Sequence, residues 1–272
     1  ERGKNLFRAM QYDKASESFR AALEADPSHP QRADMLLRSG IALFNLGRRP
    51  AAASTLERLL KAGLPDCRCA EALNWLGKSY SRLGLRDEAV ETYLKLVRMY
   101  PESDWSDDAL YHTGNVYRDA NDMKKALKYY RQLVEEYPES SLADSAIWWQ
   151  GWTYYNAGGY LKAVQTFQEL VSRYPRSFLV NQALYWQGRG AERLGDRDKA
   201  QRYYRRTVAR GPYTYYGYLA AERLAGKELP VLTVSDEPIL NEPVPGDSDL
   251  PKEGDQDLSD LDGPPDWTDE AV

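Results

Sequence analysis

The sequence predicts an all-α solenoid built from antiparallel helix pairs, and three observations support this fold class. Glycines recur every 37 residues along most of the chain, at Gly40, Gly77, Gly114, Gly151 and Gly188. An alanine stands twelve residues after each glycine, and a bulky residue stands four residues after that alanine. A proline closes most of the units. A fixed period of this length is typical of repeat proteins, in which each unit buries one face against its neighbours.

The first helix of each repeat is expected to carry the glycine. An apolar residue such as Leu73 stands four positions before the glycine, and a second one such as Tyr80 often stands three positions after it. This spacing places both side chains on one face of a helix. Leu46-Gly47 and similar pairs are suited to end the helix, because glycine adopts the left-handed conformation without steric cost.

The second helix carries the alanine and the bulky residue. The glycine and the alanine should let the two helices approach closely, while the bulky residues fill the gaps on either side. The bulky residues are Leu56, Tyr93, Tyr130, Phe167 and Tyr204. A proline lacks a backbone donor and should end the second helix. These prolines are Pro101, Pro138, Pro175 and Pro212. Ser/Asp clusters such as residues 103–108 offer N-caps for the next helix.

This pattern resembles the tetratricopeptide repeat (TPR), from about Gly3 to Pro212. The resemblance implies a right-handed superhelical solenoid of about six units in residues 1–212, the first of them truncated. The period exceeds the usual 34 residues by about one helical turn in the first helix. Repeats of this length with Tyr-Pro-Glu-Ser ends, as at Tyr100 and Tyr137, look like those of bacterial envelope proteins, which implies a periplasmic or envelope-associated location.

Residues 213–230 are predicted to form a C-terminal capping helix. The segment Tyr-Tyr-Gly-x-Leu-Ala at 215–220 resembles the end of the superhelical region of soluble lytic transglycosylases, although a plain capping helix explains it equally well. The resemblance implies a non-catalytic region that positions such an enzyme on cell-wall glycan or on partner proteins. The family's Glu-Ser pair with a following Gly-rich segment is missing here, so the chain is not expected to be an enzyme and a catalytic domain would lie beyond residue 272. The alternative is a stand-alone envelope adaptor of the outer-membrane assembly or Tol–Pal type, which binds protein segments.

The charge of the chain is divided between two parts. Residues 231–272 carry 13 acidic residues and one lysine, whereas the rest of the chain carries 28 acidic and 35 basic residues. Low hydrophobicity with high net charge does not favour folding, so residues 231–272 are predicted to be an extended, disordered linker or tail. A further possibility is that this acidic segment folds back onto the basic body.

The first helices are expected to hold the ligand-binding positions. In the TPR family they line the concave side at offsets of three before, one after and four after the glycine. These offsets select a candidate groove for protein segments or peptidoglycan, made of Asn74, Lys78, Tyr111, Asn115, Arg118, Trp148, Trp152, Tyr155, Tyr185 and Arg189. Rings and amides suit sugars, and Trp, Tyr and Arg are also common anchors in protein interfaces. The same rings could instead pack between repeats.

No catalytic residues, cofactor or metal are expected. Cys67, Cys69 and the two histidines do not supply the roughly four converging ligands of a zinc site. A disulfide between cysteines this close would be strained, so they are expected to be two small residues at a helix start, with redox chemistry or external pairing as alternatives. Nucleic acid is not an expected partner, because the positive charges are spread among many acids. No apolar stretch is long enough to span a membrane, and the oligomeric state cannot be read from the sequence.

Overall fold

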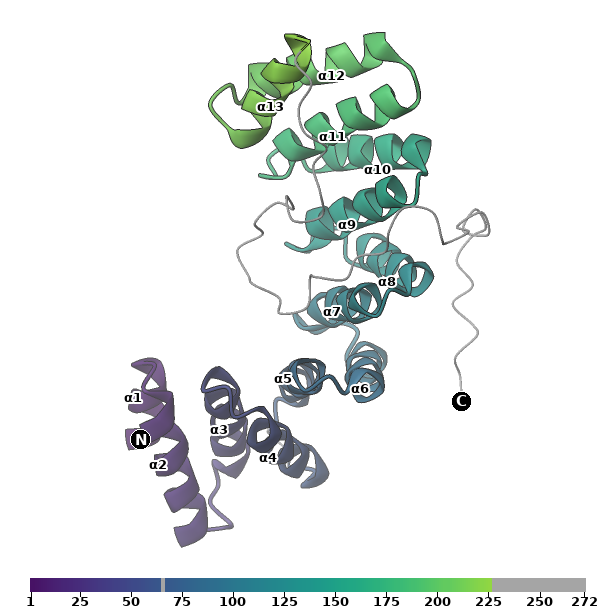
Figure 1. The fold of residues 1–272 in the computed structure, drawn as a ribbon. Coiled ribbons are helices and arrows are strands. Elements are labelled where there is room, and N and C mark those ends of the chain that lie inside the picture. The colour runs from purple at the N-terminus through teal and green to yellow at the C-terminus, as the bar shows by residue number, and fades with distance from the viewer. Residues whose placement is uncertain (65–66, 227–272) are drawn as a thin grey trace. The chain divides into compact units, whose positions relative to one another are not determined.

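The computed structural model describes residues 1–64 and 67–226, and within them it contains thirteen α-helices and no strand (Figure 1). The chain divides into two compact units, Glu1–Val116 and Tyr117–Val272. The predicted all-α solenoid of helix pairs is confirmed. The acidic segment 231–272, predicted to be an extended tail, lies outside the described residues.

The first unit is built from helices that pair in sequence order. They are α1 (Arg2–Arg8), α2 (Tyr12–Ala25), α3 (Arg32–Asn45), α4 (Arg49–Lys61), α5 (Cys69–Arg82), α6 (Arg86–Met99) and the first part of α7 (Ser106–Asp119). Helix α3 packs on α4, and α5 packs on both α4 and α6. Each repeat therefore contributes one pair, with the glycine of the 37-residue period on its first helix.

The second unit continues the same alternation after the end of α7. Its helices are α8 (Met123–Glu136), α9 (Ala143–Asn156), α10 (Tyr160–Arg173), α11 (Val180–Arg193), α12 (Arg197–Arg210) and α13 (Tyr215–Leu224). Helix α10 packs on α9 and α11, and α13 packs on α12 and also touches α11. Within the segment 213–230, predicted as a capping helix, Tyr215–Leu224 form α13 on the last helix pair, and residues 227–230 lie outside the described residues.

The helices end where the sequence predicts. Gly47 and Gly84 follow the first helices α3 and α5 with φ of +73° and +74°, the left-handed conformation that glycine adopts without strain. Helix α6 stops at Met99, just before Pro101. Helix α8 likewise stops at Glu136, two residues before a proline. The end of each of these helices is therefore set by residues close to it in the sequence.

The period glycine is in direct contact with the bulky residue of its own repeat. A Cβ added at Gly77 would lie 2.5 Å from the Tyr93 ring, and one added at Gly151 would lie 2.5 Å from the Phe167 ring. The bulky residue therefore lies directly over the glycine of its own repeat. The reason is steric, because a ring or leucine needs the space that a Cβ would occupy.

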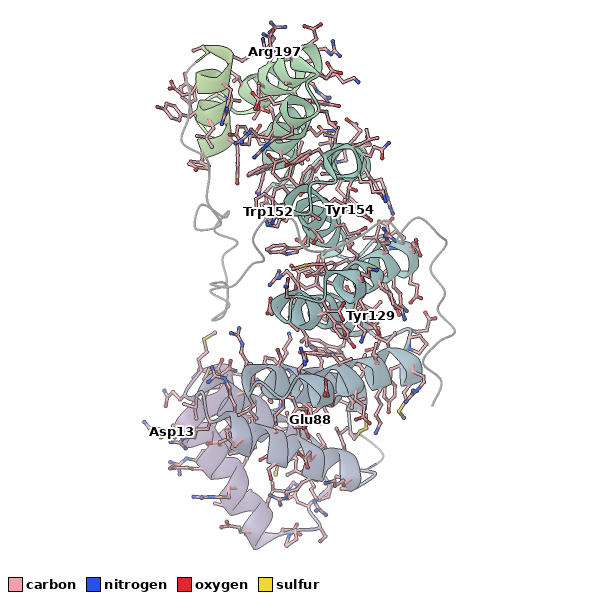
Figure 2. All side chains as sticks on the ribbon, turned by 45° about the vertical axis from the view of Figure 1, so that its right-hand side comes forward. Asp13, Glu88, Tyr129, Trp152, Tyr154 and Arg197 are labelled. Atoms are coloured by element: carbon pink, nitrogen blue, oxygen red, sulfur yellow. A yellow bond between two sulfur atoms is a disulfide. The ribbon has the colours of Figure 1, made fainter. Side chains whose placement is uncertain are left out.

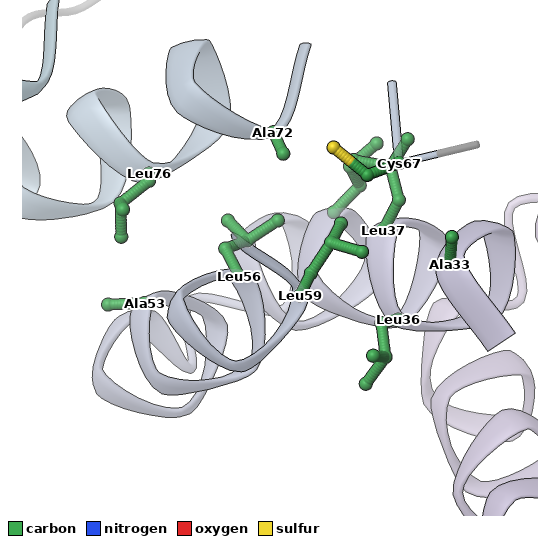
Figure 3. Packing of buried hydrophobic residues seen from close by; sticks show 10 residues of the cluster. Ala33, Leu36, Leu37, Ala53, Leu56, Leu59, Cys67, Ala72 and Leu76 are labelled. Atoms are coloured by element: carbon green, nitrogen blue, oxygen red, sulfur yellow. The ribbon is translucent and has the colours of Figure 1, made fainter. Parts of the chain in front are cut away.

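The core of the first unit shows how the repeats join. Leu36 and Leu37 of α3, Leu56 and Leu59 of α4 and Leu76 of α5 are each at most 5% exposed and form one apolar cluster (Figure 3). The cluster draws on two successive helix pairs, so each repeat completes the core of its neighbour. This sharing of apolar side chains between neighbouring repeats stabilises the array.

Candidate functional site

The ten predicted groove positions differ in how much surface they keep. Seven are buried, namely Asn74, Arg118, Trp148, Trp152, Tyr155, Tyr185 and Arg189. Lys78, Tyr111 and Asn115 are half-buried and lie on α5 and α7 within the first unit. The offsets therefore identify residues that face neighbouring repeats, and only some of these reach the surface.

A polar cluster forms between α5 and α7 in the first unit. The Asn74 side-chain amide donates a hydrogen bond to Oδ2 of Asp108 over 3.3 Å, and Lys78 Nζ lies 3.7 Å from the same oxygen. The Lys78 ammonium also lies 5.3 Å from the centre of the Trp75 ring. Asp108 thus contacts two predicted groove residues, Asn74 and Lys78. The sequence indicated Asp108 only as part of a cluster of helix-capping residues. Burial raises the pKa of the Asp108 carboxyl, and Lys78 opposes this shift.

His112 of α7 lies next to this cluster and was not predicted as a functional residue. Its ring stacks on the Tyr93 ring, with centroids 5.7 Å apart and planes 23° apart. Burial, with the positive charges of Lys78 and Arg82, lowers the pKa of His112 to about 3. The imidazole is therefore neutral in the folded protein at physiological pH.

This neutral histidine predicts a loss of stability in acid. Below about pH 6.5 the unfolded chain protonates His112 while the folded chain does not, so the free energy of unfolding falls as the pH is lowered toward 3. Relative to a His112→Gln variant, the native protein should lose about 1–2 kcal/mol between pH 7 and pH 5, as measured by urea denaturation. A difference between the two proteins that is equal at both pH values would contradict the neutral-histidine interpretation.

An aromatic cluster joins α9 and α11 in the second unit. Trp148, Trp152 and Tyr155 follow one face of α9, and each ring stacks on the next with centroids 6.0 Å apart. Trp186 of α11 meets the Trp152 and Tyr155 rings edge-on at 4.6 and 4.8 Å. We call these four residues the aromatic cluster. The sequence predicted the three residues of α9 as groove positions, whereas Trp186, two positions before Gly188, lies outside the predicted offsets.

The aromatic cluster holds polar atoms that its surroundings do not satisfy. The indole Nε1 donors of Trp148, Trp152 and Trp186 are buried and have no acceptor among the described residues. Arg189 adds positive charge, with its guanidinium 5.7 Å from the centre of the Trp186 ring and its Nη1 3.5 Å from the Tyr185 hydroxyl. Buried Trp N–H groups usually find a partner, so the cluster could donate to acceptors of a bound molecule if its edge opened.

The remaining predicted position, Arg118, serves packing in the second unit. Its guanidinium lies 4.0 Å from the centre of the Trp149 ring and pairs with Asp119. Only 5% of Arg118 is exposed. A cation held over an indole in this way contributes stability, on the order of 1–2 kcal/mol when it is desolvated.

A separate polar hollow of about 510 Å³ opens beside α9, between α8 and α10. Tyr154 and Gln150 of α9 line it together with Arg131, Lys162 and Glu169. Figure 2 shows that Tyr154 and Trp152 point to different sides of α9, so this hollow is distinct from the aromatic cluster. None of these residues stands at a predicted groove position.

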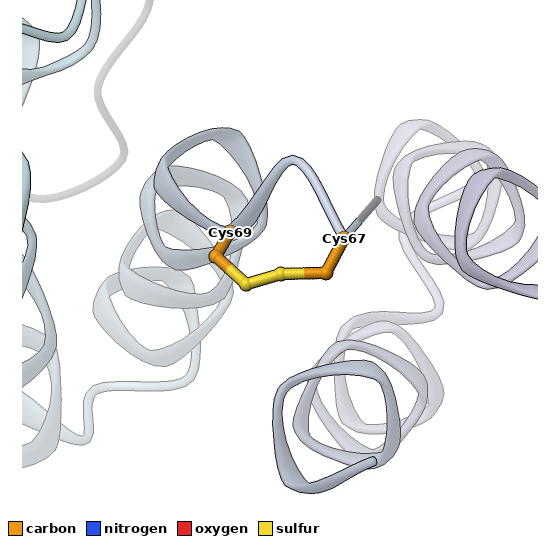
Figure 4. The surroundings of a disulfide bond; sticks show 2 residues. All are labelled: Cys67 and Cys69. Atoms are coloured by element: carbon orange, nitrogen blue, oxygen red, sulfur yellow. A yellow bond between two sulfur atoms is a disulfide. The ribbon is translucent and has the colours of Figure 1, made fainter. Parts of the chain in front are cut away.

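The two cysteines are joined in a disulfide, which corrects the expectation of two unpaired small residues (Figure 4). Arg68 between them adopts the left-handed conformation, with φ of 47° and ψ of 49°. This turn brings the two Cα atoms to 5.0 Å, within the usual range for a disulfide. Cys69 is the first residue of α5, so the predicted helix-start position is correct, and Arg68 also pairs with Glu71 in the first turn.

The described residues contain no group of three or more His, Cys, Asp or Glu side chains placed to hold a metal ion. None of the helices described is long and apolar enough to cross a membrane.

The repeated helix pairs and the side chains gathered on their first helices define a helical-repeat scaffold. Two tetratricopeptide repeat models match the chain, one over residues 1–63 and 37–104 and the other over residues 108–140, 145–177 and 182–210. Together these matches cover most of the residues from 1 to 210. The chain belongs to the tetratricopeptide repeat family.

Solved structures share the fold at low sequence identity. The C-terminal part of a TPR protein from Cytophaga hutchinsonii is 18% identical with a TM-score of 0.66, and 82% of this chain matches 85% of that one. A TPR protein from Parabacteroides merdae is 19% identical with a TM-score of 0.56, over 82% of this chain and 83% of that one. YrrB, described as a TPR protein with an unusual peptide-binding site, is 21% identical with a TM-score of 0.53, over 76% of this chain and 99% of that one. No curated protein matches the sequence.

Proposed function

We propose that this chain is a non-catalytic scaffold that binds protein segments through side chains of its first helices. The observation that carries the proposal is the surface between α5 and α7, where Lys78, Tyr111 and Asn115 keep exposed area. Lys78 and Asn115 stand at the same place in successive repeats, one residue after Gly77 and Gly114. These side chains suit a peptide ligand. The Lys78 ammonium recognises carboxylates, the Tyr111 phenol recognises apolar groups, and the Asn115 amide recognises backbone amides.

The test of this proposal uses peptides selected on the full chain, for example by phage display, and measured by calorimetry. Replacing Lys78 with glutamine should weaken binding at least tenfold, equivalent to about 1.4 kcal/mol. The matched control is Lys95→Gln, at an exposed lysine of the second helix α6, and it should bind like the native chain. Equal binding by both variants, with intact circular dichroism, would place the peptide elsewhere.

A second candidate is the superhelical region of a lytic transglycosylase, which would hold the enzyme on peptidoglycan. The observation in its favour is the Tyr-Tyr-Gly-x-Leu-Ala segment at the start of α13, although packing accounts for part of it. A Cβ at Gly217 would clash with the carbonyl oxygen of Gly211, so a tight turn alone explains that glycine. Retention of the chain on purified peptidoglycan sacculi at moderate salt would favour this candidate, and no retention would leave the protein-binding scaffold.

A periplasmic or envelope-associated location is part of the proposal. The Cys67–Cys69 disulfide supports it, because disulfides persist mainly in oxidising compartments. Thiol alkylation of cell extracts without reductant, followed by mass spectrometry, tests this location. We expect both cysteines to be protected from alkylation, and full modification would argue for a reducing compartment.

A further inference from the structure

We propose that the acidic segment 231–272 of this chain binds to a basic groove on α12, in the second unit. We call this surface the α12 groove. It is lined by Val171, Pro175, Val180, Leu184, Arg206, Ala209 and Arg210, from the end of α10, the following turn and loop, α11 and α12. The proposal concerns a surface different from the first-helix positions discussed above.

The first support is the concentration of positive charge on α12. This helix carries one acidic residue and six basic ones, all six exposed: Arg197, Lys199, Arg202, Arg205, Arg206 and Arg210. Figure 2 shows Arg197 at one end of the helix. Arg197, Arg202 and Arg206 have no ion-pair partner among the described residues, whereas Lys199 pairs with Asp196 at 2.9 Å. Several cations on α12 are therefore available to an acidic ligand.

The second support is the shape and chemistry of the α12 groove. Its volume is about 510 Å³, and its apolar lining comes from Val171, Val180 and Leu184. Arg206 and Arg210 belong to the same lining, and Nη2 of Arg210 donates a hydrogen bond to the Pro175 carbonyl oxygen over 2.8 Å. An apolar surface bordered by arginines fits a segment in which carboxylates alternate with apolar side chains, because each arginine can pair with a carboxylate.

The acidic segment of this chain has that composition. Its 13 acidic residues and single lysine oppose a body that carries seven excess positive charges. Between Asp255 and Asp262 the sequence reads Asp-Gln-Asp-Leu-Ser-Asp-Leu-Asp, so that Leu258 and Leu261 stand among carboxylates. The leucines match the apolar lining of the α12 groove, and the aspartates match its arginines.

Covalent connection makes this segment the favoured occupant over another acidic chain. Helix α13 packs on α12, so the last described helix contacts the helix that carries the proposed surface. A linker of about 30 residues has an r.m.s. span of about 30 Å, comparable to the length of two short helices. Such a linker gives an effective concentration in the millimolar range, which makes even weak contacts populated.

The test places a nitroxide label in the acidic segment of the full chain. Both native cysteines are paired, so a Ser259→Cys substitution supplies a single thiol for labelling. We expect the label to broaden the amide NMR signals of α12 and to leave those of α2–α6 unchanged. High salt should remove the broadening, because it screens contacts between exposed charges.

Charge reversal identifies the surface. The double variant Arg202→Glu/Arg206→Glu should lose the broadening of α12. The matched control Arg58→Glu/Arg98→Glu makes the same change in net charge at exposed arginines of α4 and α6. In this control the α12 signals should still be broadened. The amide spectrum of each variant shows whether it is folded.

Two measurements can overturn the proposal. If the label did not broaden the α12 signals of the native chain, docking on α12 would be excluded. Equally strong broadening in Arg202→Glu/Arg206→Glu would exclude it too, and the groove would then be left to another acidic molecule. As an independent measurement, carbodiimide should cross-link Lys199 to carboxylates of residues 253–262 in the native chain. If exposed Lys95 of α6 forms as many of these links, the attraction is not specific to α12.

Discussion

Replacing Trp148 with alanine should lower the free energy of unfolding by about 3–5 kcal/mol, the largest effect expected in this protein. The Trp148 side chain is fully buried, stacks on Trp152 and lies 5.0 Å from the Phe167 ring. Removing it leaves a cavity in the second unit that rigid helices fill only in part. Urea denaturation followed by circular dichroism measures the loss, and hydrogen exchange should locate it in α9 and α10.

The control for this prediction is Phe178→Ala in the same unit. Phe178 is 76% exposed, so its replacement should change stability by less than about 0.5 kcal/mol. If Trp148→Ala cost equally little and weakened peptide binding instead, Trp148 would be a ligand residue, as its offset from Gly151 implied. Repeat arrays can unfold in parts. If the denaturation curve shows a second transition, that transition should be assigned to one of the two units before a free energy of unfolding is derived.

A leucine in place of Gly77 should destabilise the first unit by about 3 kcal/mol. Any side chain at this position points into the Tyr93 ring, which is fully buried and has no space to move. The helix backbone must therefore shift, and the contact between α5 and α6 must open. Thermal and urea denaturation of the variant measure the cost.

Two further variants separate overpacking from other effects of leucine. Ser81→Leu adds the same side chain at an exposed position of α5 and should leave stability within about 0.5 kcal/mol. Adding Tyr93→Leu to Gly77→Leu should recover part of the loss, because the smaller side chain returns space to the contact. If the single variant were as stable as the native chain, the steric account of the period glycines would be wrong.

The sequence predicted the fold from features that act locally. Pro101 and Gly84 influence only the backbone around them, so their effects on helix ends do not depend on distant contacts. The 37-residue period then required every repeat to pack in the same way. The position of the bulky residues over the glycines was not predicted, because sequence spacing does not distinguish a ring above a glycine from a ring beside it.

The candidate site was less predictable, because burial depends on the neighbouring repeat. Trp148 and Lys78 stand at predicted positions on their first helices, yet Trp148 is fully buried while Lys78 keeps part of its surface. Asp108 joins Asn74 only when α7 lies against α5, so its role in the polar cluster needs the tertiary structure. The groove assignment itself stays a prediction until binding is measured.

The sequence by itself determined the helical class, the repeat period and the boundaries of the helices, because propensity and backbone chemistry act over a few residues. Only the tertiary structure decided which of the aligned first-helix residues pack inside and which reach the surface. The pairing of Cys67 with Cys69 is also known only from the structure, since it depends on the local left-handed turn at Arg68 that brings their Cα atoms together. The tertiary structure likewise gathered Val171, Leu184 and Arg206 into one groove. The contacts in this groove join residues from separate helices, and their distances follow from how the helices pack.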